Sequence, residues 1–163
     1  MNRADLIQQK ILSRPQLLQR MEQWRLLGKT IAFTNGVFDV LHEGHIYSLS
    51  QAAAEADILV VALNDDASVK RLKGESRPLN NQDSRSILMA SLQIVDFVVL
   101  FEEDTPLELI KSVRPDVLVK GGDYTVEQVV GAKEVIAAGG RVVINPIKEG
   151  FSTTSLIEQA KKS

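Results

Sequence analysis

Hydrophobic positions near the start of the chain recur about one helical turn apart, and this spacing predicts two helices. The Ser13-Arg14-Pro15 segment interrupts the pattern, and Gly28 ends it. The apolar faces of the two helices are formed by Leu6, Ile7 and Ile11, then by Leu17, Met21 and Trp24. We therefore expect residues 1–28 to form a helical extension that precedes a separate domain over residues 29–163.

After residue 28 the pattern changes to short apolar runs that alternate with helix-spaced segments. The runs predict strands over residues 29–34, 58–63, 97–101, 117–119 and 141–144. Helical spacing predicts helices over 44–56, 81–92, 106–113 and 126–138, and a last helix from Thr154 onward. Residues 65–80 are polar and expected to be irregular, and Asn35-Gly36 is typical of a turn. Asn80 or Asn81 suits a helix cap, and Ser155 and Glu158 have capping-box spacing.

Strands that alternate with helices predict an α/β fold, here a five-stranded parallel sheet with helices on both faces. Ligands of such sheets bind outside the carboxyl ends of the strands. Functional residues should therefore follow the strands, and the chemically distinctive segments of this chain do so.

Composition narrows the classes of function. The chain has 163 residues and no cysteine, which excludes disulfide scaffolds, thiolate metal sites and cysteine nucleophiles. Its 19 basic and 21 acidic residues give a net charge of −2, which is not the charge of a general nucleic-acid binder. No apolar run approaches the ~18 residues of a membrane span, and no signal-peptide core opens the chain. We expect a cytoplasmic protein without nucleic-acid or membrane partners.

The 2 histidines of the chain, His42 and His45, lie in one tetrapeptide behind the first predicted strand. Their spacing places both imidazoles on one side of a helix N-terminus, where free N–H groups already favour anions. Gly44 between them allows a phosphate to approach the backbone. The pair therefore favours phosphate binding. A local cap with a packed imidazole is one alternative, and a metal site with a third ligand from elsewhere is another.

The residues around this pair give a family resemblance. Residues 34–45 read TNGVFDVLHEGH, which resembles the signature of the cytidylyltransferase-like nucleotidyltransferases. A second signature of that superfamily opens its last helix, and EGFSTT over residues 149–154 resembles it. The resemblance covers Leu17 to Ala160 and implies a Rossmann-like sheet with a phosphate site at His-x-Gly-His.

Three further segments resemble the D-glycero-β-D-manno-heptose 1-phosphate adenylyltransferases. These are the lysine segment 68–74 with Arg77-Pro78, the block from Asp104 to Tyr124, and the helical N-terminal extension. The resemblance implies transfer of AMP from ATP to the heptose 1-phosphate, which gives ADP-heptose for lipopolysaccharide synthesis and releases pyrophosphate. It also implies Mg²⁺ as the cofactor that accompanies ATP, and a possible homodimer.

The resemblance assigns catalysis to His42, His45 and Lys73, with the imidazoles on the ATP phosphates and the lysine neutralising developing charge. No metal ligands are assigned. The expected nucleotide- and substrate-binding residues are Thr34, Asn35, Gly36, Val37, Phe38, Asp39, Gly44, Asn64, Lys70, Arg77, Arg85, Lys120, Gly121, Gly122, Asp123, Ser152, Thr153 and Thr154. Phe151 and Ser155 stand where family members often carry a basic residue, and Lys148 is the nearest substitute.

Structural interpretations of these positions remain open. The basic residues of segment 65–80 also suit a solvated surface, and Asp39 suits a residue that fixes the turn. Residues 120–123 suit a plain strand-to-helix turn, and 152–154 suit a helix cap. Two other functions also remain open: a cytidylyltransferase or adenylyltransferase for another phosphate such as glycerol 3-phosphate, and a nucleotide-sensing module without catalysis. The choice between ATP and CTP is not encoded in a recognisable motif.

Overall fold

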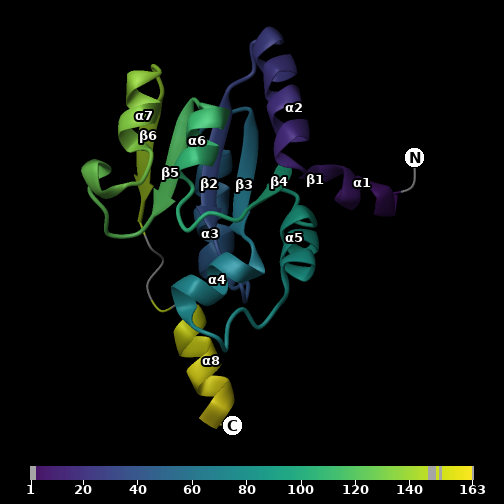
Figure 1. Cartoon of the computed structure of the whole chain (residues 1–163), viewed down its shortest axis with the longest axis vertical. Helices are drawn as coiled ribbons and strands as arrows, with labels where there is room; N and C mark the ends of the chain where they lie inside the picture. The colour runs from purple at the N-terminus through teal and green to yellow at the C-terminus, as the bar shows by residue number, and fades with distance from the viewer. Residues whose placement is uncertain (1–2, 147–149, 151, 163) are drawn as a thin grey trace.

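The computed structural model describes residues 3–146, 150 and 152–162, and Figure 1 shows its helices and strands around a central sheet. The strands are β1 Ile11–Leu12, β2 Ile31–Gly36, β3 Ile58–Asn64, β4 Phe97–Phe101, β5 Val117–Gly121 and β6 Arg141–Asn145. The helices are α1 Arg3–Lys10, α2 Arg14–Leu26, α3 Glu43–Ala53, α4 Asp66–Lys73, α5 Gln82–Ala90, α6 Leu107–Val113, η1 Val126–Gln128, α7 Ala132–Ala137 and α8 Thr153–Lys162.

The sheet has the order β1-β4-β3-β2-β5-β6, and its paired strands are parallel. The chain moves outward from β2 through β3 to β4, then returns to the other side of β2 as β5. The order therefore reverses between β2 and β5, where Ala32 lies opposite Val117 and Phe33 opposite Leu118. In open α/β sheets this reversal opens a crevice at the carboxyl ends of the two strands, and ligands bind there.

The predicted strand count of five was wrong, because the sheet has six strands. Ile11, expected on a helical face, belongs to the short edge strand β1 and lies opposite Val98. Lys10 Nζ fixes this segment by donating to the carbonyl oxygens of Ala90 and Leu92 at 3.1 and 3.0 Å. A two-residue strand shows no alternation that a sequence pattern could reveal. The division of the chain at residue 28 stays a prediction.

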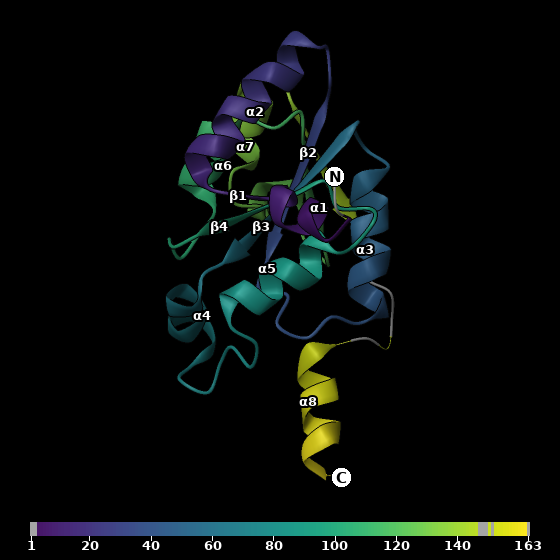
Figure 2. The same ribbon diagram turned by 90° about the vertical axis from the view of Figure 1, so that its right-hand side faces the viewer.

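Side chains alternate across the sheet and form a core on each face. Phe33, Val60 and Ala62 pack on one face against buried residues of α2, α6 and α7. Leu59, Val61 and Leu63 pack on the other face with buried residues of α3 and α5. Figure 2 shows α2, α6 and α7 on one side of the sheet and α3 on the other. The prediction of helices on both faces is confirmed.

Two predicted segments differ from the structure. Residues 65–80, expected to be irregular, begin with helix α4, because the Asp65 side chain caps it by accepting from Ser68 N at 2.8 Å. The helix expected over 126–138 is divided into η1 and α7. Gly131 causes this division, since its φ is +86° and a Cβ there would lie 2.8 Å from Ile110 Cδ1.

The turn expected at Asn35-Gly36 lies later in the chain. Both residues still belong to β2, and the left-handed residue is Phe38 with φ 48°. Gly36 has a packing role, because a Cβ there would lie 2.7 Å from the Phe38 ring. The ring can therefore fold back over the end of β2 and reach the histidine pair.

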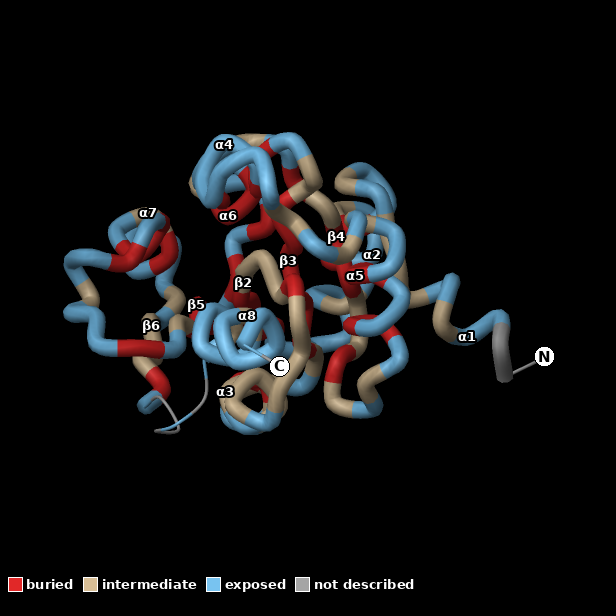
Figure 3. The backbone as a smooth tube through the Cα atoms, turned by 90° about the horizontal axis from the view of Figure 1, so that it is seen from below, coloured by how far each residue is buried: buried red, intermediate tan, exposed pale blue. Residues whose placement is uncertain are grey.

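The last helix, α8, extends away from the sheet (Figure 1) and has no buried residue among those described (Figure 3). Its first turn is capped by Ser152, whose Oγ accepts from Ser155 N at 3.4 Å. The capping box expected at Ser155 and Glu158 is wrong, because Ser155 already lies inside the helix. Over the described part of the chain, no helix combines the length and the apolar character needed to cross a membrane.

Candidate functional site

The histidine pair lies at the N-terminus of α3, directly behind the end of β2. His42 is the N-cap residue of α3, but its side chain makes no capping hydrogen bond. The His42 and His45 rings stack with centroids 3.8 Å apart, and the Phe38 ring meets His45 edge-on at 5.1 Å. This arrangement disfavours the interpretation as a local cap and presents two imidazoles side by side at a helix N-terminus.

Burial keeps both imidazoles neutral. It lowers the pKa of His42, and burial together with the repulsion that a protonated His42 would exert lowers the pKa of His45 to about 4. Nδ1 of His45 is buried and has no hydrogen-bond partner among the described residues. A neutral imidazole carries one donor and one acceptor, and an adjacent anion would raise its pKa. The pair can therefore donate hydrogen bonds to a phosphate and take up a proton when one binds.

Two cavities of about 190 Å³ each open at the carboxyl ends of β2 and β5. The first, which we call the histidine cavity, is lined by Thr34, Asn35, Gly36, Val37, Phe38, His45, Ser48, Lys120 and Gly121. The second, which we call the tyrosine cavity, is lined by Asn35, Pro106, Lys120, Tyr124, Gln128, Val129 and Val130. Both linings include Asn35 and Lys120, so the two cavities adjoin. A larger cavity of about 350 Å³ lies between α6 and α7, away from every predicted site residue.

Two lysines from distant segments meet near these cavities. Lys73 ends α4, and Lys120 lies on β5. Burial lowers the pKa of Lys120, and the nearby charge of Lys73 lowers it further. The Lys120 ammonium group lies 5.4 Å from the centroid of the Tyr124 ring. His45 and Lys120 therefore line the same cavity, with His42 stacked on His45 and the charge of the exposed Lys73 acting on Lys120, a combination suited to phosphate groups.

Glycines let the backbone approach closely across the crevice. A Cβ on Gly121 would lie 2.9 Å from Ser48 Oγ on α3. The next residue, Gly122, has φ 128° and its N–H donates to Asn145 O at 3.0 Å. Gly44 belongs to the first turn of α3. Asp123 is exposed and lines neither cavity.

Asp39 anchors the loop that follows α4. Its buried carboxylate accepts from the backbone N–H groups of Leu79 and Asn80 at 2.9 and 2.8 Å and from Arg77 Nε at 2.7 Å. Burial alone would raise the pKa of Asp39, but these bonds from Asn80, Leu79 and Arg77 hold it below its usual value. The geometry fits the interpretation of Asp39 as a turn-fixing residue with Arg77 as its partner, and a nucleotide contact of either side chain stays a prediction.

Arg85 and Asn64, expected as binding residues, lie inside the protein. The Arg85 side chain is 0% exposed and donates to the carbonyl oxygens of Val37, Asn64 and Asn80 and to the Asp66 carboxylate. Asn64 Nδ2 donates to Ser68 Oγ at 2.8 Å. These groups connect the ends of β2 and β3 to α4 and α5. Lys70 is exposed on α4 and lines neither cavity.

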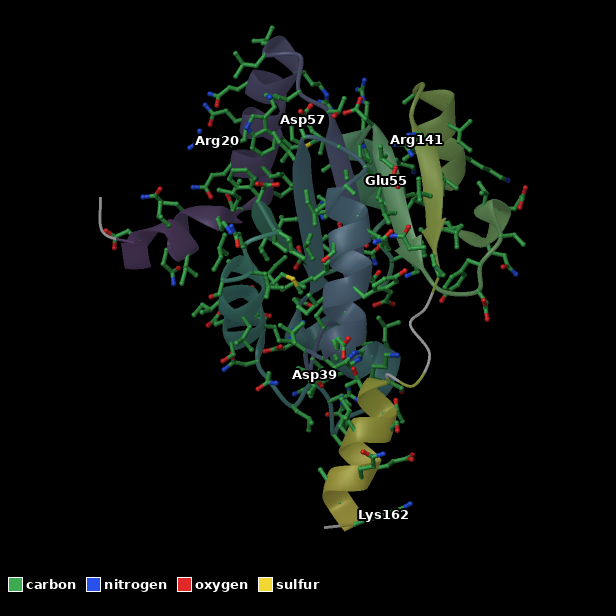
Figure 4. All side chains as sticks on the ribbon, turned by 180° about the vertical axis from the view of Figure 1, so that it is seen from behind. Arg20, Asp39, Glu55, Asp57, Arg141 and Lys162 are labelled. Carbon is green, nitrogen blue, oxygen red and sulfur yellow. The ribbon has the colours of Figure 1, made fainter. Side chains whose placement is uncertain are left out.

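The start of α8 lies against the loop between β2 and α3, where Thr153 Oγ1 donates to Val40 O at 3.4 Å. Figure 4 shows Asp39 of this loop close to α8, at the end of the molecule opposite Glu55 and Arg141. The N-terminus of α8, which includes Thr153 and Thr154 and follows Ser152, is therefore held against the loop that leads to α3. The expectations for Lys148 and Phe151 lie outside the described residues.

Sequence reasoning did not select Ser48, Pro106 or Gln128, and it used Tyr124 only as part of a motif. These residues line the cavities because of the order of the strands, and no local signal marks them. The described residues contain no group of three or more His, Asp or Glu that could hold an ion.

Comparisons with known proteins agree with this geometry. A family model described as Cytidylyltransferase-like matches residues 33–159. The Bifunctional protein HldE of Caulobacter vibrioides is 57% identical over 91% of this chain and 31% of its own length. The protein of the same name from Koribacter versatilis is 55% identical over 93% of this chain and 31% of its own length. The chain therefore spans about a third of the length of these relatives.

Two solved structures share the fold. The lipopolysaccharide core biosynthesis protein of Thermoplasma volcanium has a TM-score of 0.60 and 31% identity over 74% of this chain and 98% of its own. A pantoate-beta-alanine ligase of Francisella tularensis, solved with an ATP compound and beta-alanine, has a TM-score of 0.63 over 93% of this chain and 76% of its own. Its identity of 16% supports a common Rossmann-like fold only.

Proposed function

Because this chain belongs to the cytidylyltransferase-like family, we propose that it transfers AMP from ATP to D-glycero-β-D-manno-heptose 1-phosphate. The products are ADP-heptose, a lipopolysaccharide precursor, and pyrophosphate. One observation carries the reaction type: His45, stacked on His42 at the N-terminus of α3, lines a cavity that Lys120 also lines, and the charge of Lys73 acts on Lys120. Such a site supplies donors and positive charge without an activated nucleophile.

The reaction needs no residue to act as a nucleophile. An oxygen of the sugar 1-phosphate attacks the α-phosphorus of ATP, a new P–O bond forms, and the bond to the β-phosphate oxygen breaks. Pyrophosphate leaves with that electron pair, and no redox partner takes part. Catalysis then consists of alignment and stabilisation of charge on the α-phosphate. His42 and His45 donate to the phosphates, and Lys73 neutralises the charge that develops.

Support for a heptose phosphate as the acceptor comes from relatives and from sequence segments. The HldE proteins are similar over 91–93% of this chain, and the Thermoplasma protein is named for lipopolysaccharide core biosynthesis. Residues 68–74 and 120–124 also resemble the heptose adenylyltransferases. We expect Mg²⁺ to enter with the triphosphate as its counter-ion. A homodimer and a cytoplasmic location remain parts of this proposal.

Pyrophosphate release tests the proposal directly. ATP and CTP are each combined with Mg²⁺ and one of three acceptors: heptose 1-phosphate, glycerol 3-phosphate or phosphopantetheine. Release with ATP and heptose 1-phosphate alone supports the proposal. Release with another pair overturns the substrates while leaving nucleotidyl transfer in place. ATP binding without release for any acceptor favours a nucleotide-sensing module. A His45→Ala variant measures release that does not depend on the site.

A further inference from the structure

Three helices end side by side at the amino end of the sheet. Strands β2, β5 and β6 are neighbours in the sheet, and α2, α6 and α7 precede them in the chain. All three helices lie on the same face of the sheet (Figure 2). Arg25 joins two of the ends, because its guanidinium donates to the carbonyl oxygens of Val113 and Arg114 where α6 ends. This surface lies at the opposite end of the strands from the histidine pair, so the reaction does not account for it.

Helix α2 ends in a turn over residues 26–28, which we call the leucine turn. The exposed fractions of Leu26 and Leu27 are 89% and 74%, the highest among the large hydrophobic residues of the described chain. Gly28 closes the turn with φ 69°, and its N–H donates to Arg25 O at 3.0 Å. The two leucines stabilise nothing within their own chain. Adjacent apolar side chains that are held in solvent in this way indicate a contact with a partner.

The cavity between α6 and α7, which we call the helix cavity, has the size and the lining that such leucines require. Its apolar walls are formed by Ile110, Val135, Ala137 and Ala138, and its volume is about 350 Å³. Ile110 and Val135 belong to the buried core, so the walls are fixed by packing. Removal of one buried leucine side chain leaves a cavity of about 150 Å³. The helix cavity therefore has room for two leucine side chains.

A second copy of the chain is the partner that the structure itself supplies. The hydrogen bonds of Arg25 fix the leucine turn beside the end of α6, and the exposure of Leu26 and Leu27 places both side chains outside the cavities of their own chain. A copy related by a twofold axis can bring its leucines to this helix cavity and offer its own cavity in return. The turn and the cavity share one surface, as a symmetric contact of this kind requires.

The charged rim of the helix cavity suits the same partner. Lys111, Arg114 and Glu134 complete the lining. Within the described part of the chain Glu134 forms no ion pair. Lys29 follows the leucine turn directly, and its side chain is 51% exposed. A second copy that inserts its leucines therefore brings the Lys29 ammonium group toward the rim, where the Glu134 carboxylate complements its charge.

We propose that the leucine turn and the helix cavity form the interface of a symmetric homodimer. Leu26 and Leu27 of each copy enter the helix cavity of the other copy. This inference rests on the homodimer of the proposed function and does not depend on the reaction. The interface lies at the amino ends of the strands, so both histidine pairs stay open to substrates at the outer ends of the dimer.

Sedimentation equilibrium over a series of protein concentrations tests the interface. Leu26→Glu removes an apolar contact of the turn, and Ala137→Arg blocks the cavity from an exposed position of its wall. Leu6→Glu is the matched control, because Leu6 is a leucine that is 44% exposed but lies on α1. All three positions are exposed, so the monomers should fold like the original chain, and circular dichroism checks this.

We expect Leu26→Glu and Ala137→Arg to raise the Kd of the dimer by at least about 100-fold, because each substitution changes both contacts of a symmetric dimer. Leu6→Glu should change the Kd less than about 2-fold. Dissociation by Leu6→Glu alone would place the interface on α1 and overturn the inference.

Cysteine cross-linking tests the pairing of the turn with the cavity. The chain has no cysteine, so an introduced cysteine is its only thiol. Leu26→Cys and Ala137→Cys are each treated with a short bismaleimide, separately and as an equal mixture that has been diluted and concentrated again to exchange subunits. Cross-linked dimers that form in the mixture but not with either variant alone support the inference. Cross-linking of one variant with itself, or none in the mixture, would overturn it.

The proposed function and the interface fail in different ways. If the original chain is a dimer that Leu26→Glu and Ala137→Arg leave intact, the interface is wrong and the homodimer stands. If the original chain is a monomer at every concentration, the interface and the homodimer are both wrong. Pyrophosphate release by the original chain decides the reaction separately in either case.

Discussion

Replacing Arg85 by alanine should destabilise the protein strongly, and this prediction separates a structural role from a ligand contact. The Arg85 guanidinium is 0% exposed and donates four hydrogen bonds. Three of them reach backbone carbonyl oxygens, those of Val37, Asn64 and Asn80. The fourth reaches Asp66, whose side chain is 33% exposed and can be rehydrated in the variant. The main cost therefore comes from the carbonyl groups.

The magnitude follows from those carbonyl groups. A buried polar group left without a partner costs about 1–3 kcal/mol, although water can enter the space that the side chain leaves. We therefore expect the free energy of unfolding to fall by about 3–5 kcal/mol. For a domain of this size, each kcal/mol lowers Tm by about 2–4 °C. Urea unfolding followed by circular dichroism measures the first quantity, and calorimetry measures the second.

Arg71→Ala is the matched control for this measurement. Arg71 also bonds one carboxylate and one carbonyl oxygen, those of Asp104 and Glu102, but its side chain is 49% exposed. Exposed ion pairs contribute about 0–1 kcal/mol, so this variant should unfold almost like the original chain. If Arg85→Ala keeps the original stability while the KM for ATP rises, the structural assignment is refuted and Arg85 binds the nucleotide.

Three further predictions concern His45. His45→Ala should lower pyrophosphate release by about 10²–10³-fold while changing the free energy of unfolding by less than about 1 kcal/mol, and comparable losses in both would contradict a catalytic role. The pKa of His45 is lowered to about 4 in the folded chain, so the unfolded chain binds more protons below its ordinary pKa of about 6.5. The free energy of unfolding should therefore fall by about 1–2 kcal/mol between about pH 6.5 and about pH 4, a range that allows for the water that reaches the ring. Urea unfolding at several pH values should show a shallower fall for His45→Ala than for the original chain. Binding of ATP should raise the pKa of His45, so calorimetry at about pH 5.5 in two buffers of different ionisation enthalpy should detect proton uptake, and identical enthalpies would refute it.

The parts of the fold that local patterns encode could be predicted from the sequence. The strand over 97–101 matches the structure because a continuous apolar run between polar segments has one interpretation in a parallel sheet. The N-cap of α5 at Asn81 was among the predicted alternatives, since its side chain accepts from Ser84 N. Strand β1 was missed because its order comes from pairing with β4, a partner far away in the sequence.

The residues of the candidate site also fall into two groups, those that a local pattern predicts and those that only the folded structure brings to the site. His42, His45 and Gly44 form one contiguous signal, and the structure places them at the predicted helix N-terminus. Arg85 could not be distinguished from a surface cation, because its burial depends on carbonyl groups from three other segments. Charged residues are rarely buried without partners, and a sequence does not display those partners. Gln128 was missed for the corresponding reason, since the order of the strands places it beside Lys120.

The two cavities explain why such a motif identifies a reaction more readily than an acceptor. Most of the histidine cavity comes from the single stretch between Thr34 and Ser48, with Lys120 and Gly121 added from β5. The tyrosine cavity combines β2, the residue in front of α6, β5 and the segment around η1. Substitutions in η1 can therefore change the tyrosine cavity without altering the histidine pair.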